Sequence, residues 1–103
     1  MLNGDGTKIY MAEGDFGEET PFVLTGEDIE KDDLFVFKIK NKEKNIIEKK
    51  YTLNEGVFLL SFTEEESKLL PAGNYRWGLK QYRQDKLINT IVLSGKFEVE
   101  RGV

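Results

Sequence analysis

Apolar residues recur at every second position along much of this 103-residue chain, which is the period of a β-strand with one buried face. The alternation is clearest at Phe35, Phe37 and Ile39. Together with turn residues between the runs, it predicts strands at residues 8–12, 20–25, 34–40, 46–53, 57–62, 74–82, 87–93 and 96–100. Seven or eight short strands in one chain predict an all-β, immunoglobulin-like antiparallel sandwich, with residues 1–103 forming a single domain.

One segment departs from the strand period. Thr63 followed three residues later by Glu66 is typical of a capping box, and it predicts a short helical turn over residues 63–70. A helix of about two turns is marginal by itself, so we expect the packing of Leu69 to stabilise it.

The chain contains no cysteine and no histidine. Disulfides, thiolate metal sites, histidine-assisted nucleophiles and zinc motifs of the HExxH type are therefore excluded. Asp15-Phe16-Gly17 matches the metal-binding tripeptide of protein kinases, but the other kinase motifs are missing and the match is a coincidence. We expect no catalytic residue, no cofactor and no metal, and a true enzyme is the least favoured alternative.

Fifteen basic and 19 acidic residues give a formal net charge of −4. An acidic balance works against nucleic-acid binding, and the lysines between Lys38 and Lys50 are interrupted by Glu43 and Glu48, as on a solvated hairpin face. The acidic loop formed by Glu27, Asp28, Glu30, Asp32 and Asp33 is likewise expected to be solvated. No signal peptide or membrane-spanning run is expected, so a soluble protein made in the cytoplasm is predicted.

Several apolar residues fall on the strand face opposite the core. Val36, Val57 and Leu59 have this parity, and Tyr82 lies opposite its strand's inward aromatic residues. Scattered apolar residues on a surface are ordinary. Alternatively, a partner covers them, and we predict Val36, Val57, Leu59 and Tyr82 as partner contacts, in a homo-oligomer or with another protein.

Two alternatives to a structural role remain open. Exposed aromatic residues such as Tyr10 and Tyr82 could bind carbohydrate or cell wall, whereas Tyr75 and Trp77 share the parity of the core. The chain could also be an accessory domain of a longer enzyme.

Four segments of the chain follow one another in a recognisable order: Glu13-Gly14-Asp15 with residues 22–25, the strand at 35–40, residues 58–77 with Pro71-Ala72-Gly73-Asn74-Tyr75, and Gly95-Lys96-Phe97-Glu98-Val99. This order of motifs resembles a family of small phage-encoded β-sandwich domains. The four segments are similar to the N-terminal domain of the baseplate upper protein of phages and prophages of Gram-positive bacteria. The resemblance implies a virion structural module of the tail or baseplate that docks to other tail chains without cofactor or catalysis. No ligand residues carry over.

Overall fold

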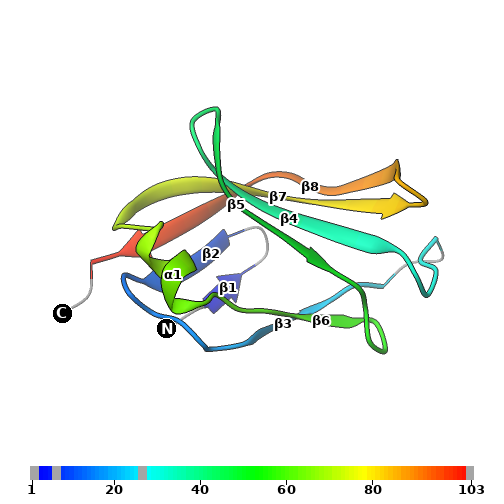
Figure 1. The fold of residues 1–103 in the computed structure, drawn as a ribbon, viewed down its shortest axis with the longest axis horizontal. Helices are drawn as coiled ribbons and strands as arrows, with labels where there is room; N and C mark the ends of the chain where they lie inside the picture. Colours follow the sequence, from blue (N-terminus) through cyan, green and yellow to red (C-terminus); the bar gives the residue numbers. More distant parts are fainter. Residues whose placement is uncertain (1–2, 6–7, 26–27, 102–103) are drawn as a thin grey trace.

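The computed structural model describes residues 3–5, 8–25 and 28–101, and it shows an all-β sandwich with one short helix (Figure 1). The elements are β1 (Asn3–Asp5), β2 (Lys8–Ala12), β3 (Thr20–Val23), β4 (Leu34–Asn41), β5 (Lys44–Tyr51), β6 (Val57–Leu60), α1 (Glu64–Lys68), β7 (Gly73–Arg83) and β8 (Lys86–Glu100). The sandwich class and the short helical turn are confirmed. No helix in the described ranges is long and apolar enough to cross a membrane.

The two layers differ greatly in size. One is a six-stranded sheet in the order β1-β2-β8-β7-β4-β5, and the other is the pair β3-β6, seen below it in Figure 1. The prediction of a purely antiparallel sandwich is wrong at one place, because β2 pairs with β8 in parallel, with Ile9 opposite Phe97. Alternation within a strand cannot reveal this, since both strand directions have the same period.

The core lies between the two layers and is rich in aromatic rings. Phe22 of the small layer stacks on Phe58, with ring centroids 4.9 Å apart, and meets Trp77 of the large sheet edge-on at 5.9 Å. Phe37, Phe58 and Trp77 are all buried, as their parity predicts. Tyr75 is buried as well, so neither of the two inward aromatic residues of β7 forms part of a surface platform.

Strand β8 is continuous, whereas the sequence predicted two strands separated at Ser94-Gly95. The register between β7 and β8 shifts at three places along the pair. At the first, Trp77 pairs with Gly95 but Leu79 pairs with Val92, so β8 advances one residue more than β7, as in a β-bulge. Gly78 lies opposite the bulge, where an added Cβ would come within 3.3 Å of the Val92 carbonyl oxygen. A side chain at this position would be crowded by the β8 backbone, and glycine avoids that crowding.

Helix α1 begins with the predicted capping box. Thr63 Oγ1 accepts a hydrogen bond from the Glu66 backbone at 3.1 Å, and the Thr63 backbone donates to Glu66 Oε1 at 2.9 Å. Lys49 of β5 reaches the same Oε1 at 2.9 Å, which ties the helix to the large sheet. The prediction for Leu69 is wrong, because its side chain is 54% exposed and Leu70 is the one fully buried.

A tyrosine links the turn after α1 to the start of β7. The Tyr75 hydroxyl donates to the Pro71 carbonyl oxygen, four residues earlier, at 2.5 Å. This contact is similar to the tyrosine corner of immunoglobulin-like sandwiches, in which a tyrosine near the start of a strand bonds back to the preceding turn.

Candidate functional site

The four residues predicted as partner contacts lie on two opposite surfaces. Val57 and Leu59 belong to β6 and point away from the core on the outer side of the small layer. Val36 of β4 and Tyr82 of β7 lie on the outer side of the six-stranded sheet. Since the inner sides of both layers form the core, one copy of the chain cannot bring the two pairs together.

The outer side of the small layer is entirely apolar along its paired residues. Pro21 is opposite Leu59 and Val23 is opposite Val57, and residues paired in this way share a face of the sheet. Val23 is 67% exposed and Leu59 is 47% exposed. We call Pro21, Val23, Val57 and Leu59 the apolar face; the prediction missed Pro21 and Val23, although Val23 has the parity opposite Phe22.

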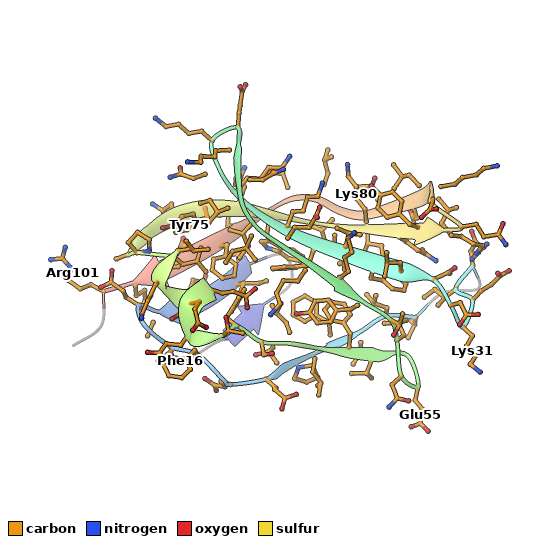
Figure 2. All side chains as sticks on the ribbon, in the orientation of Figure 1. Phe16, Lys31, Glu55, Tyr75, Lys80 and Arg101 are labelled. Carbon is orange, nitrogen blue, oxygen red and sulfur yellow. The ribbon has the colours of Figure 1, made fainter. Side chains whose placement is uncertain are left out.

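The two chain segments that carry this apolar face are acidic. Residues 13–30 and 52–67, which contain β3, β6, most of α1 and their connections, hold eleven acidic residues and neither lysine nor arginine. Cations from other segments pair with four of them: Arg83 with Asp28 and Glu30, Lys68 with Glu64, and Lys49 with Glu66. Glu19 precedes β3 and Glu55 precedes β6, and both are exposed. Figure 2 shows Glu55 pointing away from the molecule on the side opposite Lys80.

The outer side of the large sheet carries a row of cations in register. Arg76 of β7 is directly opposite Lys40 of β4 and Lys96 of β8, and Lys96 is in turn opposite Lys8 of β2. All four side chains are exposed. Lys38 and Lys80 lie on the same side of the sheet, opposite Gly78 and Val36. We call this surface the basic face.

The basic face contains a hollow at Gly78, which has no side chain to fill it. A hollow of about 220 Å³ is lined by Val36, Trp77, Gly78, Leu93 and Ser94 together with Lys38, Lys40, Lys42, Arg76 and Lys80. No acidic residue takes part in this lining. We call it the basic hollow; Val36, only 7% exposed, lies at its floor, and Leu93 is largely exposed.

A second hollow, of about 490 Å³, adjoins the basic hollow through Val36 and Lys38. Tyr82 lines it together with Leu34, but Asp32, Glu48 and Asp85 also contribute, so its charge is mixed. Lys38 forms an ion pair with Glu48 at 3.3 Å within this region.

The basic face could not be predicted from the sequence, because its cations come from four separate strands. The lysines between Lys38 and Lys50 do not form one surface, since Lys49 turns inward toward α1, where it also donates to the Ser61 carbonyl oxygen. Burial raises the pKa of Glu66, but hydrogen bonds from Thr63 and Lys49 outweigh it and the net pKa is lowered.

The acidic loop before β4 is only partly solvated, and the prediction is wrong for Asp33. This carboxylate is buried and accepts hydrogen bonds from the Glu30 backbone at 2.8 Å, from Gln81 Nε2 at 2.7 Å and from both Arg83 Nε and Nη2 at 2.8 Å. The Arg83 hydrogen bonds are the largest cause that holds the pKa of Asp33 well below its usual range. The network fastens the loop to β7; Glu27 lies outside the described residues.

The aromatic residues considered for carbohydrate binding do not meet. Tyr10 of β2 pairs with Glu98 of β8, and Glu98 pairs with Asn74 near the start of β7. Tyr82 lies near the end of β7. Eight strand residues separate Asn74 from Tyr82, a distance of about 26 Å. Among the residues that the structure describes, no group of three or more acidic side chains is arranged to hold a metal ion.

Comparisons with protein-family models, with curated proteins and with solved structures find no match to this chain.

Proposed function

We propose that this chain is a non-catalytic association module that docks another protein through its apolar face. The observation that carries the proposal is the pairing of Pro21 with Leu59 and of Val23 with Val57, which gathers four apolar side chains on one exposed surface. Clustered apolar side chains with a polar rim are typical of protein-binding surfaces. Here Glu19 and Glu55 supply part of such a rim.

The setting that we propose is a phage or prophage tail or baseplate. Its support is the resemblance of residues 58–77 and 95–99 to the N-terminal domain of the baseplate upper protein. In such a particle the apolar face would dock against another tail chain, and no cofactor would take part.

Co-expression with the products of neighbouring genes tests the proposal. The wild-type chain should elute with at least one of them, and V23K/L59K should weaken that complex at least tenfold, because docking would bury two lysines in an apolar contact. L69K is the matched control, since Leu69 is similarly exposed and lies outside the apolar face.

Retention of the complex by V23K/L59K, or its loss in L69K, would overturn the assignment of the apolar face. Neighbouring genes without tail, holin or endolysin functions would count against the phage setting alone.

A further inference from the structure

The distribution of charge points to head-to-tail self-association, in which the apolar face of one copy docks onto the basic face of the next. This pairing rests on the proposed function, because it names a second copy of the chain as the occupant of the same apolar face.

Charge complementarity favours this arrangement over a two-fold dimer. The segments that carry the apolar face hold eleven acidic and no basic residues, and Glu19 and Glu55 beside it are exposed, although four of the eleven are ion-paired with cations from other segments. The basic face displays Lys8, Lys40, Arg76 and Lys96 in one row. Two apolar faces in contact would bring acidic rims together, and two basic faces would bring the cation rows together. Only the unlike faces attract each other.

The basic face also offers a small apolar surface, mainly that of Leu93, to the incoming copy. Val36 and Gly78 form the floor of the basic hollow and Leu93 projects beside it. Val23 and Leu59 of the next copy can occupy this region while Glu19 and Glu55 lie against the surrounding cations. The predicted partner contacts Val36, Val57 and Leu59 thus belong to one interface, divided between two copies.

The cations of the row repel one another in the isolated chain, which favours binding of an acidic surface. Like charges directly opposite each other in a sheet are destabilising, and Arg76 has such a neighbour on each side. The carboxylates of a second copy would offset this repulsion.

The size of the apolar face limits the strength of the contact. Two strands with four paired residues each cover about 13 Å by 10 Å. A standard interface buries about 800 Å² on each partner, so most of this one must come from the charged rim. The association is therefore expected to be weak and sensitive to salt. Because the contact joins unlike faces, it can continue into a ring or filament.

Sedimentation velocity on the purified chain measures this association. At an ionic strength of about 0.01 M, where the Debye length is about 30 Å, the average mass should rise above 11.9 kDa as the protein concentration increases. At about 1 M salt, where the Debye length is about 3 Å, the mass should return to that of the monomer.

Charge-reversal variants identify the two faces. K40E/R76E places two carboxylates at the centre of the cation row, and E19K/E55K places two lysines in the rim of the apolar face, so each variant alone should be monomeric. An equimolar mixture should associate again, because the new carboxylates of one variant then meet the new lysines of the other. V23K/L59K should also be monomeric.

The oligomeric state of each variant distinguishes head-to-tail pairing from a two-fold dimer and from a monomer. Self-association of K40E/R76E alone would show apolar faces meeting in a two-fold dimer and would overturn the head-to-tail pairing, as would a mixture that stays monomeric. A wild-type chain that is monomeric throughout would overturn it as well, while the co-expression test would still decide the proposed function. If charge reversal prevents folding, as seen by circular dichroism and Trp77 fluorescence, K40Q/R76Q should fold and shift the association at least tenfold toward monomer.

Discussion

Asp33 lies in the turn before β4, and all the donors around its carboxylate converge from one loop and one strand. Gln81 and Arg83 of β7 reach it from one side and the Glu30 backbone from the other. A buried carboxylate that keeps its charge in this way stabilises the fold only while it is ionised.

Asp33→Asn should destabilise the protein at pH 7 by about 1.5–3 kcal/mol, since charged hydrogen bonds to a buried acceptor are lost. The folded-state pKa of Asp33 lies below the unfolded value of 3.8, so its contribution is complete above that value and is lost as the pH falls through the folded pKa. The difference between wild type and variant should thus shrink below about pH 4. Urea unfolding at pH 7, 5 and 3, followed by Trp77 fluorescence, measures it; a difference that is constant with pH would contradict the prediction.

Tyr75 provides a second test at a single side chain. Tyr75→Phe keeps the edge-on contact with Phe97, whose centroid lies 6.4 Å away, but removes the hydrogen bond to the Pro71 carbonyl. The free energy of unfolding should fall by about 1 kcal/mol. Tyr82→Phe, on the outer side of the same strand, should change it by less than about 0.5 kcal/mol. Equal stability of the two variants would show that the tyrosine corner contributes nothing.

At the scale of neighbouring strands, the row of cations is expected to lower the stability of the fold. Lys96→Glu replaces two like-charged cross-strand pairs, with Arg76 and with Lys8, by two opposite-charged pairs. The variant should be more stable than wild type by about 0.5–1 kcal/mol at low salt, and less so as salt is added. Lys44→Glu is the control, because the same change of charge occurs opposite the neutral Asn41. A destabilised K96E protein would contradict the assigned register.

Within single strands, alternation predicted most of the buried side chains but not Val36, which has the outer parity and is nevertheless only 7% exposed. Phe37, Phe58 and Trp77 are inward because parity is a property of each strand alone. The pairing of one strand with another and the continuity of a strand could not be predicted from alternation. The parallel pairing of β2 with β8 depends on sheet order, and the continuity of β8 depends on a bulge opposite Gly78.

The candidate site could be predicted only in part, for the same reason. Val57 and Leu59 were identified by parity, but their partners Val23 and Pro21 became visible only through the β3–β6 register. The helix gave a related error: in only five residues, a small difference in phase exchanges the exposed Leu69 for the buried Leu70.

The net charge of the whole molecule is modest, but its acidic and basic residues are unevenly distributed along the chain. All 15 basic residues lie outside residues 13–30 and 52–67, although the chain as a whole carries −4. Folding places most of these two segments in and around the small layer and brings cations from β2, β4, β7 and β8 together on the opposite outer side. Net charge describes solubility, whereas this arrangement determines how the molecule is oriented toward a charged partner.

Ion-exchange chromatography measures that separation independently of self-association. Although its predicted pI is 4.9, the wild-type chain should be retarded on a cation exchanger at pH 7.5 and low salt, because the basic face can bind the resin while the acidic segments face solvent. K40E/R76E should pass through without retardation, since the centre of the row has been reversed. K44E should remain retarded, because Lys44 lies at the exposed β4–β5 hairpin outside the row. Passage of the wild-type chain in the void volume would show that the cation row is too strongly offset by nearby carboxylates to act as one surface, and head-to-tail pairing would lose its electrostatic basis.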